Sequence, residues 1–139
     1  YEGFGKAPKA VLQSQEPWHE GISGAIAELL TIPQPYMTAI EVALGGNQQN
    51  IVTQDTETAK AAIAFLKRKH LGRVTFLPLS TISVQYPKER EKEAENGEGA
   101  IGWANELVEI DDSCRKAADF LLARILVVDT LDHALACAS

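Results

Sequence analysis

The sequence contains an internal repeat at an offset of 78 residues, and this repeat restricts the fold more than any other feature. Residues 24–32 (GAIAELLTI) recur as residues 102–110 (GWANELVEI), so that 102 − 24 = 78, with four of the nine positions identical. Further pairs at this offset are Ala39 with Ala117 and Leu44 with Leu122, and an offset of 75 then pairs Val52 with Val127. Chance similarity of two apolar segments is the alternative, but the match favours one supersecondary unit used twice.

The first copy predicts strands that alternate with helices. The expected order is an apolar run at 25–32, a helix at 34–44, a strand at 50–53, a helix at 56–70 and a strand at 74–79. This order predicts an α/β or mixed α+β fold. The run at 25–32 fits either a strand or a helix, and we favour a strand because the equivalent runs precede helices in both copies. Asp55 is expected to cap the helix at 56–70, whose apolar face comprises Ala59, Ala62, Ile63 and Leu66.

The second copy begins at Gly102 and is expected to be incomplete. Its helix opens at Asp111 or Asp112 and carries a stripe of buried positions at Cys114, Ala117, Ala118, Leu121 and Leu122. A strand at 125–128 and a last helix from about Leu131 follow, and the sequence ends at Ser139 before a closing strand. Between the copies, the polar residues 85–99 show no apolar periodicity, which predicts a solvated and mobile connector.

Composition excludes several classes of protein. A chain of 139 residues with 45% hydrophobic content can bury the core of one ordinary domain. It has no apolar run of about 18 residues and no basic-then-apolar leader, so we expect a cytoplasmic protein with no membrane partner. The net charge of −6 limits any nucleic-acid contact to a local or weak one, because such affinity comes chiefly from lysine and arginine.

Motifs for catalysis, cofactors and metals are missing from the sequence. It has no phosphate-binding glycine loop, no C-x-x-C and no H-E-x-x-H. We interpret Cys114 and Cys137 as core residues rather than a disulfide or reactive pair. His19, His70 and His133 lie far apart, and the acids Asp129 and Asp132 beside His133 fit a helix start better than a metal site. We therefore predict no catalytic, cofactor-binding or metal-binding residues.

The remaining polar candidates have structural explanations that we favour. Repetition of a unit explains the equivalent acids Glu28 and Glu106 better than a paired acid-base site does. Gly45 and Gly46 follow a helix and fit a C-terminal cap rather than a phosphate cradle. Trp18 and Trp103 are expected to pack at the edge of the core. The basic cluster comprises Lys67, Arg68, Lys69, His70 and Arg73; it suits the negative end of a helix dipole, with contact to phosphates as the alternative.

Several segments together resemble a known family. They are 21–25 (GISGA), 36–45 (YMTAIEVALG), 49–53 (QNIVT) and 71–79 (LGRVTFLPL). They resemble the hinge of bacterial SMC (structural maintenance of chromosomes) proteins over about residues 11–138, and 72–79 is the most specific piece. The motif positions that carry the resemblance are Gly24, Gly45, Gly72, Arg73, Phe76, Pro78 and Gly102.

The resemblance implies a structural module rather than an enzyme. SMC hinges are two related subdomains inserted between the halves of a long coiled coil, and they join two SMC subunits in chromosome condensation and segregation. The ATPase activity belongs to a head domain that these residues do not include. The implied organisation is a flank next to the coiled coil at 1–20, subdomain I at 21–84, the connector at 85–99 and a partial subdomain II at 100–139.

The implied partners are a second hinge, in a homodimer, and DNA in a weak contact near the nucleoid. The family's dimer contact uses a glycine-rich segment at the end of the second subdomain, which does not occur here, so we expect these 139 residues alone to be monomeric or to associate differently. The DNA contact would use Lys67, Arg68, Lys69 and Arg73. A small α/β enzyme or ligand-binding domain is the alternative function, and a dedicated nucleic-acid-binding domain would need a broader basic face.

Overall fold

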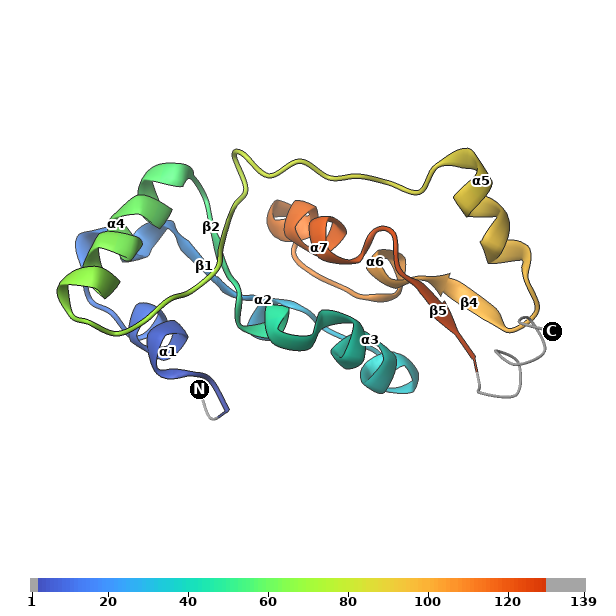
Figure 1. The fold of residues 1–139 in the computed structure, drawn as a ribbon, viewed down its shortest axis with the longest axis horizontal. Helices are drawn as coiled ribbons and strands as arrows, with labels where there is room; N and C mark the ends of the chain where they lie inside the picture. The colour runs from blue at the N-terminus through green and yellow to red at the C-terminus, as the bar shows by residue number, and fades with distance from the viewer. Residues whose placement is uncertain (1–2, 130–139) are drawn as a thin grey trace.

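The computed structural model describes residues 3–129, which form two units that share the order strand, helix, helix, strand (Figure 1). The first unit comprises α1 (Lys6–Leu12), β1 (Ile22–Ala25), α2 (Ile26–Leu29), α3 (Met37–Leu44), β2 (Ile51–Thr53), α4 (Thr56–Arg68) and β3 (Phe76–Pro78). The second comprises α5 (Glu89–Lys92), β4 (Ala100–Trp103), α6 (Ala104–Leu107), α7 (Arg115–Leu122) and β5 (Leu126–Val128). Short 3-10 helices lie at Pro17–Gly21 (η1), Gln34–Tyr36 (η2), Gly45–Gln49 (η3), Glu93–Asn96 (η4) and Asp112–Cys114 (η5).

The repeat found in the sequence is confirmed by the positions of these elements. α6 begins 78 residues after α2 (104 − 26), α7 begins 78 after α3 (115 − 37), and β5 begins 75 after β2 (126 − 51). Even the irregularity of the strands is repeated, because the register shifts between Ile22 and Gly24 in β1 and between Ala100 and Gly102 in β4. One supersecondary unit is therefore used twice.

Each unit is built on a small sheet. In the first, β2 is central, antiparallel to β1 and parallel to β3, with Val52 opposite Gly24 on one side and Leu77 on the other. In the second, β4 and β5 form an antiparallel pair. The predicted mixed fold is thus confirmed, as are the strands at 50–53, 74–79 and 125–128 to within two residues at their ends.

The two units meet at equivalent positions. The backbone N–H of Thr31 donates to the carbonyl oxygen of Glu109 at 2.7 Å, and the N–H of Glu109 donates back to Thr31 at 2.8 Å. Because 109 − 31 = 78, each residue pairs with its own counterpart. Such reciprocal pairing is the mark of a two-fold contact, here between two halves of one chain.

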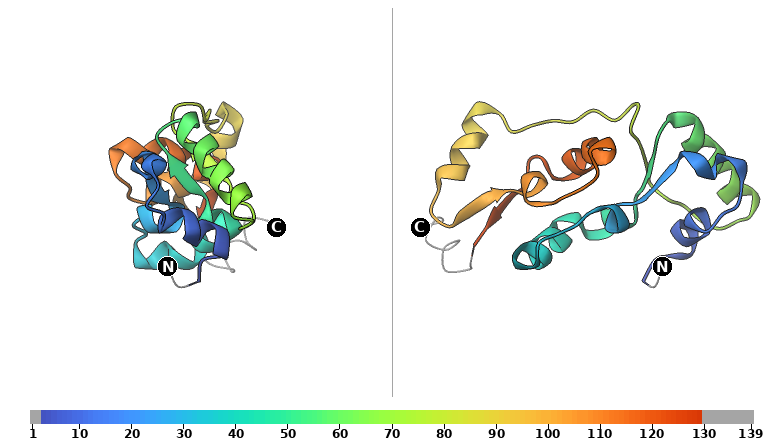
Figure 2. Two further views of the ribbon diagram at one scale, coloured as in Figure 1. Left: turned by 90° about the vertical axis from the view of Figure 1, so that its left-hand side faces the viewer. Right: turned by 180° about the vertical axis from the view of Figure 1, so that it is seen from behind.

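The main core lies between the units and is drawn from both. It contains four pairs of equivalent residues at offsets of 78 or 75, all at 5% exposure or less: Ile26 with Ala104, Ile40 with Ala118, Leu44 with Leu122, and Val52 with Val127. A second core is confined to the first unit, where α1 and α4 pack on the other face of its sheet; it contains Val11, Ala25, Ile51, Ala62, Phe65 and Leu66. The side and rear views show α1 and α4 together at one end of the molecule (Figure 2).

The strand favoured for residues 25–32 is wrong over most of that range. β1 ends at Ala25, and the chain turns at once into α2. The Glu28 carboxylate accepts a hydrogen bond from the backbone N–H of Ala25 at 3.1 Å, which holds this first turn. Gly24, at φ +140°, supplies a backbone conformation that other residues rarely adopt. Apolar residues here fill a core beside a short helix, and periodicity alone does not separate that case from a strand.

The connector at 85–99 is exposed as predicted but is more structured than predicted. It contains α5 and η4, and the Glu91 carboxylate accepts a hydrogen bond from the backbone N–H of Lys88 at 2.8 Å at the start of α5. Arg124 donates to the same carboxylate at 2.6 Å, and the Tyr86 hydroxyl donates to Asp119 at 2.9 Å, which raises the pKa of Tyr86. Polar side chains hold this segment to α7, so the lack of apolar periodicity is no guide to its structure.

Helix α1, which lies within the flank proposed at residues 1–20, packs against the first unit. Val11 of α1 is fully buried in the second core, with Leu12 at 7% exposure. The proposed boundary at residue 20 therefore separates a helix from the sheet that it covers. Within residues 3–129 no helix is both long enough and apolar enough to cross a membrane. The helix expected from about Leu131 lies outside the described residues.

Replacement of Leu122 tests the shared core. Leu122 is fully buried between the units, so Leu122→Ala should lower the free energy of unfolding by about 2–5 kcal/mol through lost burial and the cavity that remains. Phe120→Ala on the same helix is the control, since Phe120 is 43% exposed, and we expect a loss of about 1 kcal/mol or less. Urea unfolding measures both, and equal losses would contradict a core shared across the repeat.

Candidate functional site

The candidate site lies on α4, whose start is held by the cap that the sequence predicts. The Asp55 carboxylate accepts hydrogen bonds at 2.8 Å from the backbone N–H of Thr58 and from the Thr58 hydroxyl. These bonds, the backbone one first, lower the pKa of Asp55 below its ordinary value of 3.8. The buried face of α4 comprises Thr58, Ala59, Ala62, Phe65 and Leu66. The prediction that Ile63 belongs to that face is wrong, because Ile63 is 40% exposed.

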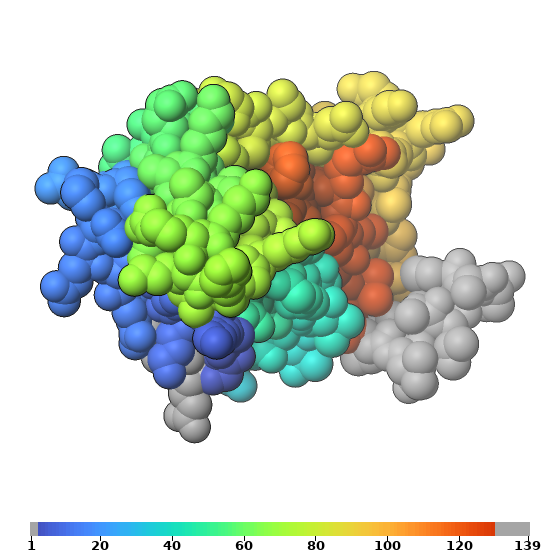
Figure 3. Space-filling view, turned by 60° about the vertical axis from the view of Figure 1, so that its left-hand side comes forward, coloured from blue at the N-terminus to red at the C-terminus, as the bar shows by residue number. Residues whose placement is uncertain are grey.

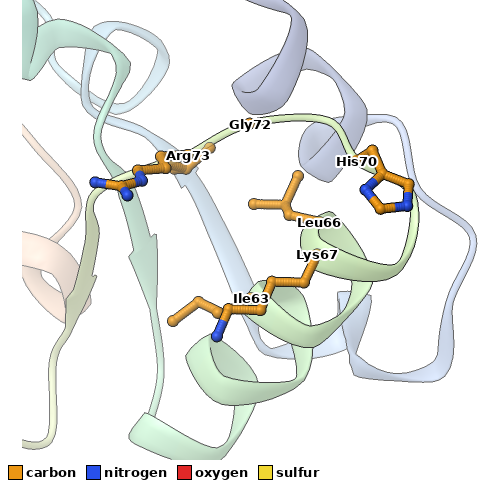
Figure 4. A pocket seen from close by; sticks show the side chains of 7 residues that line it. Ile63, Leu66, Lys67, His70, Gly72 and Arg73 are labelled. Carbon is orange, nitrogen blue, oxygen red and sulfur yellow. The ribbon is translucent and has the colours of Figure 1, made fainter.

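The end of α4 turns back on itself and forms a pocket. His70 has φ 54° and Gly72 has φ 100°, both in the left-handed region, and the N–H of Leu71 donates to the carbonyl of Leu66 at 3.0 Å. This turn places Arg73 at the wall of a hollow beside α4. The resulting hollow of about 600 Å³ is lined by Ile63, Leu66, Lys67, His70, Gly72, Arg73 and Val74 (Figure 4).

The four basic residues predicted to contact DNA are not equivalent in the structure. Lys67 and Arg73 line the same pocket, and Lys69 is exposed outside it. Arg68 is directed elsewhere: its guanidinium lies 3.7 Å from the Glu16 carboxylate and 5.9 Å from the centre of the Phe65 ring. Figure 3 shows the helix and the residues after it, in green to yellow-green, spread over one face of the molecule. The cluster is therefore divided into Arg68, which is paired with Glu16, and three cations without a carboxylate at ion-pair distance among residues 3–129.

Most family-motif positions support the backbone rather than a site. A Cβ on Gly24 would lie 3.2 Å from the Leu29 side chain, and one on Gly102 would lie 3.4 Å from the equivalent Leu107. The absence of a side chain at each glycine therefore lets the leucine pack closely against the strand. Gly45 caps the C-terminus of α3 at φ 52°, as predicted. Phe76 and Pro78 lie on β3, and only Gly72 and Arg73 line the pocket.

The other candidates from the sequence have structural roles. Cys114 is buried in the shared core, as predicted, and the Nε2 atom of His19 lies 3.1 Å from the Leu12 carbonyl oxygen. Glu28 binds the Ala25 backbone, which accounts for it without catalysis. Among residues 3–129 no group of three histidine, cysteine, aspartate or glutamate residues could hold a metal ion. Cys137, Asp132 and His133 lie outside the described residues.

Both tryptophans pack at the edges of the core, as predicted. The Trp18 ring meets Phe65 edge to face with 5.4 Å between centroids. Trp103 is 8% exposed, and its Nε1 donates to the Glu95 carboxylate of η4 at 2.8 Å. The sequence gives no sign of the pocket, because the helical pattern assigns Ile63 to the buried face and residues 74–79 to a strand.

Comparison with known proteins agrees with the two-unit architecture. Residues 19–138 match the family model of the SMC proteins Flexible Hinge Domain. The chain belongs to the SMC hinge family. The hinge is 42% identical over 137 residues to the chromosome partition protein Smc of Lactiplantibacillus plantarum. This match covers 98% of the hinge and 12% of that protein. It is 40% identical over 135 residues to Smc of Bacillus subtilis, and this match covers 96% of the hinge and 11% of that protein.

Solved structures agree with this assignment. An asymmetric dimer of the Geobacillus stearothermophilus SMC hinge domain matches with a TM-score of 0.90 and 42% identity, over 98% of this hinge and 54% of that chain. The Pyrococcus furiosus SMC hinge domain matches with a TM-score of 0.75 and 32% identity, over 95% of this hinge and 66% of that chain. The resemblance seen in the sequence, and the hinge fold that it implies, are therefore confirmed.

The Asp55 cap gives a prediction with a definite sign. Because its folded-state pKa is lowered, the carboxylate's stabilising contribution is fully present above the unfolded-state value near 3.8 and is lost as the pH falls through the folded-state pKa. Asp55→Ala should thus lower the free energy of unfolding of the hinge at pH 7, and the difference from the parent should shrink at about pH 2.5. Urea unfolding at both pH values measures this. Asp112→Ala, at another exposed acid, is the control, and a difference independent of pH would contradict the cap.

Proposed function

We propose that this hinge joins two copies of a chromosome partition protein through hinge-to-hinge contact. The observation that carries the proposal is the match of nearly the whole chain, at a TM-score of 0.90, to a hinge domain solved as a dimer. The hinge spans 11–12% of the Smc relatives it matches, so the rest of such a protein would supply the coiled coil and the ATPase head. On this proposal the hinge is a non-catalytic joint that acts in the cytoplasm at the nucleoid.

The second unit offers a surface suited to such a contact. Ile101 and Val128, on β4 and β5, are 39% and 44% exposed. The counterpart of Val128 in the first unit is Thr53 (128 − 75), which is fully buried. Within residues 3–129, β4 and β5 pair only with each other, so each has one side without a partner strand. Strands with an unpaired side and exposed apolar residues favour association with a partner's strand.

This proposal is tested on the full-length protein that carries the hinge. We expect the parent protein to sediment as a dimer at micromolar concentration, and the double variant Ile101→Glu with Val128→Glu to shift toward monomer, because two buried charges in a contact are costly. Val42→Glu is the control, since Val42 is also apolar and 76% exposed but lies on α3. A monomeric parent protein would contradict the joint, whereas a variant that remains dimeric would place the contact elsewhere.

A second candidate function is weak contact with DNA through the basic cluster. It is supported by the exposure of Lys67, Lys69 and Arg73, for which the described residues provide no carboxylate within ion-pair distance. Arg68 would contribute less, since Glu16 already neutralises it. The net charge of −6 keeps this contact local.

The DNA contact predicts a dependence on salt that the cations control. Replacing Lys67, Lys69 and Arg73 with glutamine should weaken binding of a duplex oligonucleotide and flatten the plot of log affinity against log salt by roughly one unit per cation. Fluorescence anisotropy at several salt concentrations measures the slope. A triple variant at Lys9, Lys60 and Lys92, which removes the same charge from other surfaces, is the control. Equal slopes for the two triple variants would contradict a localised contact.

A further inference from the structure

The pocket at the end of α4 combines an apolar floor with a cationic rim. Ile63, Leu66 and Val74 form the apolar side, and Lys67, His70 and Arg73 form the polar side. Figure 4 shows Leu66 near the centre, with His70 and Arg73 on opposite sides of it. A single exposed apolar residue is ordinary, but the exposed Ile63 lines a hollow with Lys67 beside it. Concave sites with an apolar lining and few polar groups are typical of ligand binding.

A second hollow adjoins the first across residues 73 and 74. It has a volume of about 430 Å³, shares Arg73 and Val74 with the first, and includes Lys6 and Gln49 in its wall. Arg73 therefore stands between an apolar hollow and a more polar one. We refer to these two neighbouring hollows, which share Arg73 and Val74, as the groove. Two neighbouring hollows suit an extended segment better than a compact small molecule.

The cations of this groove favour an acidic occupant. Arg68, the neighbour of Lys67 on α4, lies 3.7 Å from the Glu16 carboxylate, and Lys60 lies 3.8 Å from Glu57. Lys67 and Arg73 have no such carboxylate among residues 3–129. Hydrogen bonds from these cations to carboxylates would be charge-assisted and stronger than neutral ones. A partner's carboxylates would form ion pairs with Lys67 and Arg73, as Glu16 does with Arg68.

The geometry points to this groove as a docking site for an acidic peptide segment of a partner protein that carries one apolar side chain among its carboxylates. The apolar side chain packs on Ile63 and Val74, which line the hollow and are not fully buried, and the flanking carboxylates meet Lys67 and Arg73. DNA would use the same cations and compete for them, but a phosphate backbone does not need the apolar floor. Dependence on Ile63 therefore separates the peptide from nucleic acid. The docking site is also separate from the proposed hinge-to-hinge surface at Ile101 and Val128.

Fluorescence anisotropy with the whole chain and a labelled peptide tests the inference. The probe is acetyl-Glu-Glu-Leu-Glu-Glu-amide, with the same peptide carrying alanine in place of leucine as its control. We expect saturable binding of the leucine peptide, with Kd on the order of 100 μM, and roughly tenfold weaker binding of the alanine peptide. Lys67→Gln, Arg73→Gln and Ile63→Ser should each weaken the leucine peptide by roughly tenfold.

Two matched variants complete the experiment. Lys60→Gln removes one charge from α4 outside the groove, and Val42→Ser removes an exposed apolar residue from α3; both should change the affinity less than about twofold. The inference is overturned if the two peptides bind equally or if neither binds up to about 2 mM. It is also overturned if a single-stranded oligonucleotide binds through Lys67 and Arg73 while Ile63→Ser has no effect on either ligand, since the cations would then serve phosphates alone.

Discussion

The pairing of Thr31 with Glu109 is the contact on which the rest of the hinge depends. Two backbone hydrogen bonds of 2.7 and 2.8 Å join the two copies of the repeat at counterpart residues. Without the other copy, one face of each sheet would lie open, since among residues 3–129 one copy has three short strands and the other two. The two-fold arrangement solves this problem by placing one apolar face of each copy against the other, so that a mutation in either half of the shared core weakens both.

The first unit has a second apolar face, and covering it creates the groove. β2 is buried on both sides: Val52 faces the shared core, while Ile51 faces α1 and α4. α4 is thus held by the sheet along one side, which leaves Ile63 and Lys67 on the other. The turn through His70 and Gly72 then returns the chain to β3 and sets Arg73 beside them. The groove and the proposed joint lie in different units, so each can be altered without the other.

Local patterns predicted the elements that bury a periodic face or carry a capping residue. α4 begins after Asp55 and α7 follows Asp111 and Asp112, as expected from capping and apolar spacing. The same patterns misplaced residues 26–29, where the burial of Ile26 and the Glu28 contact with Ala25 produce a helical turn inside an apolar run. They also missed α5, whose contacts are polar: Glu91 binds Arg124, which is far away in sequence. Such contacts leave no periodic signal.

The sequence by itself determined the repeat, its two offsets and the family, because these depend on which residues stand at which spacing. It also determined the composition of the basic cluster. Only the tertiary structure decided that Thr31 meets Glu109, that Arg68 is neutralised by Glu16, and that Ile63 lies beside Lys67 and Arg73 in a groove rather than in the core. The physical reason is that exposure and charge pairing depend on which elements pack together, and a helical pattern specifies an apolar face without specifying how much of it a neighbouring sheet covers.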